Sequence, residues 1–167
     1  MSNLQEPILS QYLASFEMLK QAVLQCPEAL WNAPGDRNQF WHIAYHVLFY
    51  THLYAHENSE KFTVWTQHRP HYEQLGPYPQ TSQGKPQIGE PYTKAEILAY
   101  LEFCVQDVKE KTPSLDLESH TSGFSWLPFG KLELQIYNIR HLQHHTAELM
   151  ERLGERTKID IDWVGMK

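Results

Sequence analysis

The chain has 167 residues, of which 41% are hydrophobic and 13% aromatic, so it is long enough and apolar enough to bury the core of one domain. Its formal net charge is −6, with acidic and basic residues interspersed, which excludes the basic surface typical of proteins that bind nucleic acid or anionic membranes. Neither a basic, apolar leader nor an apolar run of membrane-spanning length is present in the sequence. We therefore expect residues 1–167 to form one cytoplasmic domain with no nucleic-acid or membrane partner.

The first two predicted helices lie before residue 58. One begins near Pro7, carries apolar residues on one face and ends before Cys26 and Pro27. After a loop, the stretch from about Asn38 to Glu57 is apolar and aromatic on nearly every side. That pattern is typical of a buried central helix.

Residues 58–91 are rich in proline and glycine and are predicted to form a long irregular connection, with room for one short helical piece. Connections of this length serve as functional lids or crossovers, or are simply packed excursions of the chain. The sequence leaves these readings open.

Two further helices follow the connection. The third opens at Thr93, where Glu96 completes a capping box, and should end near Thr112. The fourth covers residues 131–153, with Gly154 placed to cap its C-terminus. The tail at residues 159–164 alternates like a strand but has no partner strand, so we expect an extended arm. Four helices with a long connection between the second and third predict an all-α four-helix bundle.

The ten histidines are concentrated in the second and fourth predicted helices. In the fourth helix, His141 and His145 are four residues apart, which places both imidazoles on one helical face. Two nitrogens in this arrangement can converge on one divalent ion at about 2.0–2.1 Å. His144 points elsewhere on the same helix. The pair therefore predicts two ligands of a metal site.

A stable site needs a third ligand from another helix, and we predict His46. It lies in the middle of the second helix, where an unpaired polar ring would be costly to bury. His42, four residues earlier, is the alternative. Three neutral imidazoles leave a coordination position open to water or substrate, which is typical of catalytic sites and not of closed structural sites.

Two other side chains of the fourth helix lie on rotations close to the histidine pair, Asn138 and Glu148. Either could orient a ligand imidazole through its free N–H group. Glu148 is the candidate catalytic residue, because its carboxylate could orient a ligand or shuttle a proton. A non-catalytic site would instead close its coordination sphere with Glu148 or His42 as a fourth ligand.

A competing interpretation needs no metal, because a pair of histidines four residues apart also arises by chance and a buried histidine is often a hydrogen-bonded core residue. We interpret the remaining histidines as surface or loop residues: His52, His56, His68, His71 and His120. The aromatic residues of the second helix favour core packing over a cofactor site. Cys26 and Cys104 form no CxxC pair and are interpreted as packed or partly exposed thiols.

The sequences FWHIAYHVL at residues 40–48 and YNIRHLQHHTAEL at residues 137–149 resemble the DinB/YfiT-like superfamily, and the resemblance extends over nearly the whole chain. It implies a four-helix bundle with a long connection, and a nickel, zinc or iron ion held by one histidine of the second helix and the HxxxH pair of the last. Carried over by position, the ligands are His46, His141 and His145. One departure is Glu148, because many relatives have glutamine in an HHxGQ motif.

The resemblance also implies an activity. We expect a metal-dependent enzyme that acts on a small molecule, of the thiol-dependent transferase or hydrolase type, with a low-molecular-weight thiol as a candidate substrate. The alternative is a non-catalytic, metal-binding or stress-associated bundle that acts through oligomerisation or a protein partner. A small bundle with this many aromatic residues also favours a homodimer.

Overall fold

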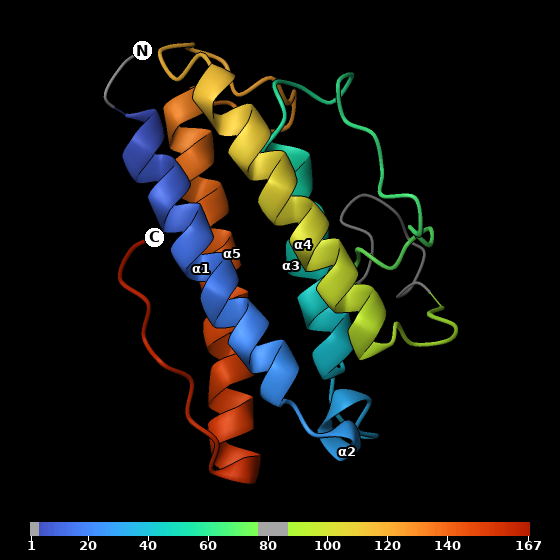
Figure 1. Ribbon diagram of the computed structural model, residues 1–167. Helices are drawn as coiled ribbons and strands as arrows, with labels where there is room; N and C mark the ends of the chain where they lie inside the picture. The colour runs from blue at the N-terminus through green and yellow to red at the C-terminus, as the bar shows by residue number, and fades with distance from the viewer. Residues whose placement is uncertain (1–3, 77–86) are drawn as a thin grey trace.

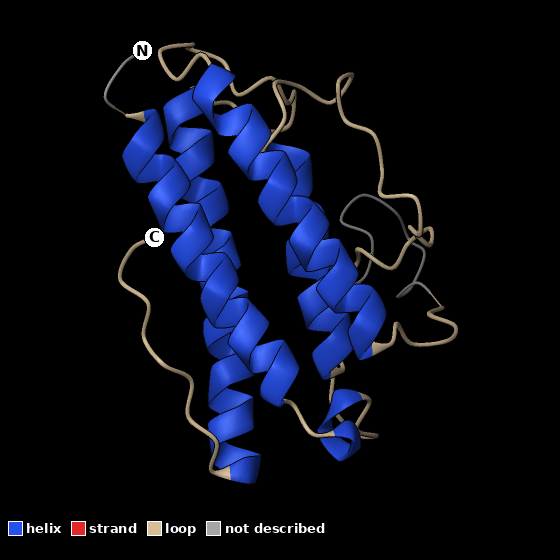
Figure 2. Ribbon diagram, viewed as in Figure 1, coloured by secondary structure: helices blue, strands red, loops and turns tan. Residues whose placement is uncertain are grey.

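The protein is described here by a computed structural model of residues 4–76 and 87–167. The described residues form four long helices, α1 (Gln5–Gln25), α3 (Phe40–Tyr54), α4 (Lys94–Lys111) and α5 (Lys131–Thr157). Two short elements accompany them, α2 (Glu28–Trp31) and the 3₁₀ turn η1 (Thr112–Ser114). Figure 2 shows no strand among these residues, and the predicted all-α class is confirmed.

The four long helices pack as a ring in which α1 contacts α4 and α5, and α3 contacts the same two helices. In Figure 1, α1 and α5 run downward, whereas α3 and α4 run upward. The chain that joins α3 to α4 therefore has to return from the upper to the lower end of the bundle, which explains why this connection is long. The neighbours α3 and α5 are antiparallel, an arrangement that places the middle of one helix beside the middle of the other.

Helix α3 is the buried central helix that its composition predicts. All but three of its residues are buried, and the exceptions are His46, Phe49 and Tyr50. Their spacing of three and four residues puts them on one face. This partly exposed face lies where α3 meets α5 and the connection. It includes one predicted ligand, His46.

A layer of hydrogen-bonded polar groups crosses the apolar core. The hydroxyl of Tyr12 on α1 donates to Oε1 of Gln135 at 2.8 Å and accepts from Nδ2 of Asn138 at 2.9 Å. The same Asn138 amide donates to the carbonyl of Thr51 on α3 at 3.0 Å. These side chains are fully buried. The layer therefore links α1, α3 and α5 at one height in the bundle.

One predicted helix end and one predicted loop were wrong. Gly154 does not cap α5, because the helix continues to Thr157 and ends at Lys158, whose backbone is left-handed with φ of 62°. The last turn is held by Arg156, whose guanidinium donates to Asp36 at 2.5 Å, so tertiary contacts extend the helix past its glycine. The segment before α3, predicted as a loop, contains the short helix α2.

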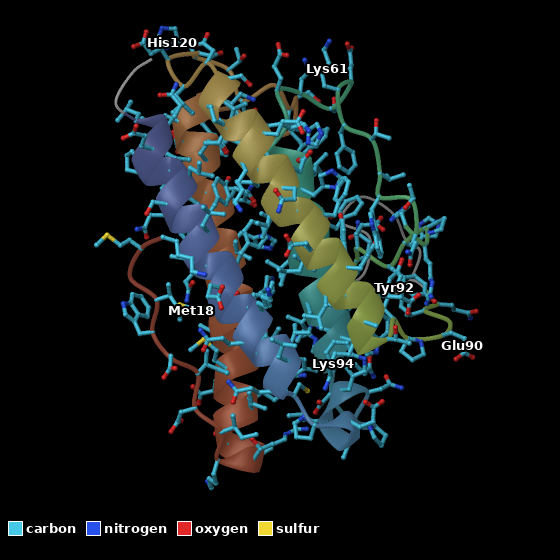
Figure 3. The ribbon with its side chains drawn as sticks, viewed as in Figure 1. Met18, Lys61, Glu90, Tyr92, Lys94 and His120 are labelled. Atoms are coloured by element: carbon cyan, nitrogen blue, oxygen red, sulfur yellow. The ribbon has the colours of Figure 1, made fainter. Side chains whose placement is uncertain are left out.

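The described parts of the connection form turns that pack on the bundle, and no helix occurs within them. Trp65 and Tyr72 are buried against α3 and α4 as part of the hydrophobic core. At the lower end of α4, Arg69 donates to Glu96 at 2.8 Å and its guanidinium lies over the ring of Tyr92, which Figure 3 labels. These contacts favour the packed-excursion reading of the connection.

The C-terminal tail is the extended arm that the sequence predicts. It runs back beside α1, as Figure 1 shows, and Gln11 on α1 donates to the carbonyl of Gly165 at 3.1 Å. Ile159 and Ile161 pack against the hydrophobic core. Among residues 4–76 and 87–167, none of the helices combines the length and the apolar character needed to cross a lipid bilayer.

Candidate metal centre

The antiparallel packing of α3 against α5 brings together the three histidines predicted as ligands. Each of these residues, His46, His141 and His145, offers one potential ligand atom. The three atoms all lie within 4.8 Å of one another. The ring centroids are 4.8 to 5.2 Å apart, and the rings are steeply inclined to one another. All three side chains are partly exposed, so the cluster is at the surface of the bundle and not in its core.

Two of the three rings have their tautomer set by a hydrogen bond on the side away from the cluster. His46 Nδ1 lies 2.5 Å from the backbone carbonyl of Glu73 in the connection. A carbonyl oxygen can only accept, so His46 Nδ1 carries the proton and Nε2 carries the lone pair. His145 Nδ1 lies 3.0 Å from Oε2 of Glu148, which assigns its lone pair to Nε2 in the same way. Histidines that bind metal ions in proteins are oriented by such contacts.

The spacing between the rings fits an ion. His46 Nε2 and His141 Nε2 are 3.3 Å apart. Two ligands of a tetrahedral zinc ion, at about 2.0–2.1 Å from it, are themselves separated by about 3.3 Å. His141 Nδ1 is buried and has no hydrogen-bond partner. The structure therefore leaves the protonation of His141 less constrained than that of the other two rings.

The surroundings of His46 and His141 keep these two rings neutral. The pKa of His46 is lowered to about 3 and that of His141 to about 4, chiefly by burial and to a smaller extent by the neighbouring imidazoles. Neutral imidazole is the form that binds a metal ion. The hydrogen bond from His145 lowers the pKa of Glu148, which keeps this carboxylate charged at neutral pH. His46 and His141 thus offer uncharged nitrogen ligands, and one carboxylate lies behind His145.

Glu148 is in turn held by a chain of charges. Arg152, one turn further along α5, lies 3.4 Å from Glu148 Oε1. The same guanidinium donates to the carbonyl of Asn38 at 2.8 Å and to the carboxylate of Asp36 at 3.2 Å. These contacts tie the loop before α3 to the part of α5 that carries the histidine pair. They fix the separation of the two ligand-bearing helices at this end of the site.

The aromatic neighbours of the cluster are tyrosines. The ring of Tyr50 lies 4.9 Å from that of His46 and 5.9 Å from that of His141, and the ring of Tyr137 stacks parallel to His141 at 6.4 Å. The hydroxyl of Tyr50 accepts from Gln74 of the connection at 3.2 Å. Trp41 and Tyr45, two further aromatic residues of α3, are buried among the aromatic residues of the core, as the sequence favours.

Several other predicted roles differ from what the structure shows. Asn138 does not orient a ligand, because its amide is committed to the polar layer in the core. His42 is buried against the connection, where its Nε2 contacts the carbonyl of Tyr72 at 2.9 Å. Glu148 contacts the outer nitrogen of His145, a position that suits an orienting group better than a fourth ligand.

The interpretation of His52 and His56 as surface residues was wrong. Both are buried, at 1% and 5% exposure, and they lie beside Asp107 of α4. The other three histidines of that group agree better with the prediction, because His71 and His120 are exposed and His68 lies in the connection. A surface assignment failed for His52 and His56 because aromatic residues distant in sequence, Phe62 and Phe103, cover the end of α3.

Sequence reasoning also missed two groups that position the site. Glu73 contacts His46 through its backbone carbonyl, and because every residue has this group, the residue type does not predict the contact. Arg152 could have been found, because it follows Glu148 by four residues and such pairs face each other on a helix. Both groups lie outside the two stretches that carry the histidines.

Comparisons with protein-family models, curated proteins and solved structures find no match to this chain. The geometry of the site is therefore the basis on which its function can be argued.

Proposed function

We propose that the chain binds one divalent transition-metal ion through His46, His141 and His145 and is a metal-dependent enzyme of the DinB/YfiT-like type that acts on a small molecule. The observation that carries the proposal is the pair of outward hydrogen bonds on His46 and His145, which assign both lone pairs to the Nε2 atoms. These hydrogen bonds leave the Nε2 atoms of both rings free to bind an ion. The arrangement of four helices with a long connection is consistent with the same family.

The donor set agrees with the ions that the family resemblance implies. Three imidazole nitrogens suit zinc, nickel or iron and are unsuited to magnesium or calcium, which prefer oxygen ligands. An ion in such a site supplies Lewis acidity and lowers the pKa of a small thiol or of water. Three protein ligands leave room for such a molecule.

The surrounding side chains suit a positioning role. Glu148 holds His145 in the tautomer that binds metal, so we assign it as a positioning residue. Tyr50 and Tyr137 provide aromatic surface beside the rings on which an apolar part of a substrate can rest. The two cysteines do not supply the nucleophile, because both are buried and burial raises the pKa of Cys26 to about 12 and that of Cys104 well above its usual range.

Elemental analysis of protein purified without an affinity tag tests the binding step. The wild-type chain should contain a divalent transition metal, and His145→Ala should contain one ion less per chain. His120→Ala is the matched control, since His120 is exposed in the loop labelled in Figure 3 and far from the cluster. Equal metal content in the wild type and His145→Ala would exclude the proposed ligand set.

Catalysis requires a separate assay. Turnover of electrophilic small molecules should be measured with a panel of low-molecular-weight thiols, and with water alone, for the wild type, His145→Ala and His120→Ala. We expect His145→Ala to lose activity and His120→Ala to keep it. Equal turnover by the wild type and His145→Ala would rule out chemistry at this centre.

A structural role for the ion is the second candidate, and one observation favours it. The carbonyl of Glu73 ties His46 to the connection, so an ion on the cluster would cross-link α3, α5 and the connection. In that case metal binding would raise thermal stability, and no thiol or substrate analogue would change the spectrum of a bound cobalt or nickel ion. A spectral change on adding a thiol would favour the enzyme.

A further inference from the structure

The chain contains a second cluster of metal-binding side chains at the upper end of the bundle. His52 lies on α3, His56 follows the end of that helix, and Asp107 lies on α4. One potential ligand atom of each is within 4.8 Å of those of the other two. All three are more than nine-tenths buried, with Asp107 at 8% exposure. The cluster shares no residue with the first site.

The distances within this cluster are too long for hydrogen bonds. Asp107 Oδ2 is 4.0 Å from His52 Nε2 and 3.9 Å from His56 Nδ1. As a result, this carboxylate oxygen is buried and has no hydrogen-bond partner. A buried, unpaired carboxylate oxygen is costly, and its presence usually indicates a missing cation, water or ligand.

The same distances suit a bound ion. Asp107 Oδ2 and His52 Nε2 are 4.0 Å apart, and zinc binds carboxylate oxygen and histidine nitrogen at about 2.0–2.2 Å. A contraction of about half an ångström would bring these two atoms to the spacing of neighbouring ligands, and His56 would contribute Nε2, because its Nδ1 donates to the carbonyl of His52. His52 is already oriented for it, because its Nδ1 lies 3.1 Å from the hydroxyl of Tyr100 and its Nε2 points toward Asp107.

The protonation state of the imidazoles favours a cation as well. Burial lowers the pKa of His52 to about 4 and lowers that of His56, which outweighs the opposing effect of the Asp107 charge. Both rings are therefore neutral at pH 7. His56 is held by a hydrogen bond from its Nδ1 to the carbonyl of His52 at 2.8 Å.

The backbone around His56 is fixed by Lys131 at the start of α5. This lysine is buried, and its ammonium group donates to the carbonyls of Glu57, at 2.5 Å, and of Ser122. The turn that carries His56 is therefore anchored to the start of the neighbouring helix α5. A ligand on such an anchored turn is preorganised.

A pocket gives the cluster access to solvent. It has a volume of about 650 Å³, is lined by His56, Lys61 and Lys111 among others, and reaches the cluster at His56. Figure 3 labels Lys61 at this end of the molecule. Lys111 lies four residues after Asp107 on α4, contacts Asp107 Oδ1 and is about one-third exposed. It supplies the positive charge that now balances Asp107, and it can move into the pocket when another cation arrives.

From this geometry we infer that His52, His56 and Asp107 form a second divalent-cation site, independent of the first, in which a metal ion competes with Lys111 for Asp107. Two nitrogen ligands and one oxygen ligand select borderline ions such as zinc, cobalt or nickel over magnesium or calcium. The pocket supplies water for the remaining coordination positions.

Zinc titration followed by elemental analysis tests this inference by counting the ions bound to the wild type and to variants of each site. The wild-type chain should bind two ions, Asp107→Asn one, the double variant His141→Ala/His145→Ala one, and the triple combination none. If the first site is wrong, the wild type binds one ion, which Asp107→Asn alone removes. The second site is overturned if Asp107→Asn binds as many ions as the wild type.

Lys111→Met is the matched control, because it removes the same ion pair from the other partner. The second site predicts that this variant binds zinc more tightly than the wild type, by about tenfold, since a competing positive charge is gone. If Asp107 served only to pair with Lys111, the affinity would be unchanged in Lys111→Met, and that result would overturn the inference. Visible absorption of bound cobalt, compared between the wild type and Asp107→Asn, reports the ligand change directly.

Discussion

Glu148 contacts the metal centre only through His145. Its Oε2 accepts from Nδ1 of that ring at 3.0 Å, whereas its Oε1 faces Arg152 at 3.4 Å. The carboxylate therefore makes the imidazole a stronger electron donor and holds its orientation, which are the usual effects of an acidic group behind a metal-binding histidine. The charge of Glu148, and not only its shape, is expected to matter.

We predict that Glu148→Gln weakens zinc binding at the first site by about 10- to 100-fold while leaving the fold intact. The amide can still accept a hydrogen bond from His145 but carries no charge. Isothermal titration with a competing chelator measures the affinity. Glu151→Gln is the control, since Glu151 is exposed on the same helix. An unchanged affinity in Glu148→Gln would mean that the carboxylate does not act on His145.

The buried histidines make the stability of the metal-free protein sensitive to acid. The pKa of His46 is lowered to about 3, and those of His52 and His141 to about 4. In the unfolded chain these rings titrate near 6.5. Below that pH the unfolded state binds protons that the folded state does not, so the folded state loses stability as the pH falls from about 6.5 toward 4.

We therefore expect the free energy of unfolding of chelator-treated protein to decrease steadily between pH 6.5 and pH 4.5, as measured by urea denaturation. The variant His52→Gln, which cannot titrate, should show a shallower decrease than the wild type. Identical pH profiles for the two proteins would contradict the assignment of His52 as a buried neutral imidazole.

Among single residues, the sequence predicted that His46, His141 and His145 lie together, and it missed the cluster of His52, His56 and Asp107. The spacing of His141 and His145 implies a shared face, whereas the mid-helix position of His46 favoured it as the third ligand and left His42 as the alternative. His52 and His56 have the same four-residue spacing, but their burial depends on Phe62, Phe103 and Asp107. Contacts between residues so far apart cannot be derived from periodicity.

Among the helices, the polar layer of Tyr12, Gln135 and Asn138 is the feature that fixes how α1, α3 and α5 align. Each of these side chains is fully buried and hydrogen-bonded to another helix. A sliding motion of one helix along another would leave these groups unpaired in an apolar core. The layer therefore also sets the register of His46 relative to the α5 histidines.

We predict that Tyr12→Phe lowers the free energy of unfolding by about 1–3 kcal/mol, because Gln135 and Asn138 each lose a buried partner. Urea denaturation of the metal-free protein measures the change. Tyr137→Phe provides the comparison, since the hydroxyl of Tyr137 makes no hydrogen bond with the described residues, and it should change stability by less than about 0.5 kcal/mol. Equal effects of the two substitutions would show that the layer contributes nothing specific.

The existence and order of the long helices were predictable, and their ends were less so. The capping box of Thr93 and Glu96 is present at the start of α4 as its sequence signature indicates. Gly154 suggested an early end for α5, but Arg152 and Arg156 both bind Asp36 near α3 and carry the helix past the glycine. Local preference at a helix end is worth about 1 kcal/mol, which a pair of tertiary contacts can exceed.

For the whole molecule, the topology determines what a metal ion would do. The first cluster joins α3 to α5, and the second joins the end of α3 to α4. An ion at the first position would cross-link two helices that are not consecutive in the chain, and an ion at the second would join α3 to α4 across the long connection. Metal binding should therefore stabilise the fold, in addition to supporting any chemistry at the first site.

Removal of metal should accordingly lower the thermal unfolding midpoint. For each occupied site, free metal at one hundred times its dissociation constant stabilises the folded state by about 2.7 kcal/mol. Differential scanning calorimetry with and without a chelator measures the shift, and adding zinc back should restore it. The variant that lacks His141, His145 and Asp107 should show no shift, and an undiminished shift in that variant would place the metal elsewhere.

The central claim is that rings from α3 and α5 bind one ion through their Nε2 atoms. Long-range ¹H–¹⁵N correlation spectra of the histidine rings during a zinc titration test it most directly, with signals assigned through single histidine variants. We predict that the Nε2 signals of His46, His141 and His145 shift together, at the same zinc equivalent, while Nδ1 of His46 and His145 stays protonated. If one or more of these three Nε2 signals stays unchanged at saturating zinc, the proposed centre does not exist.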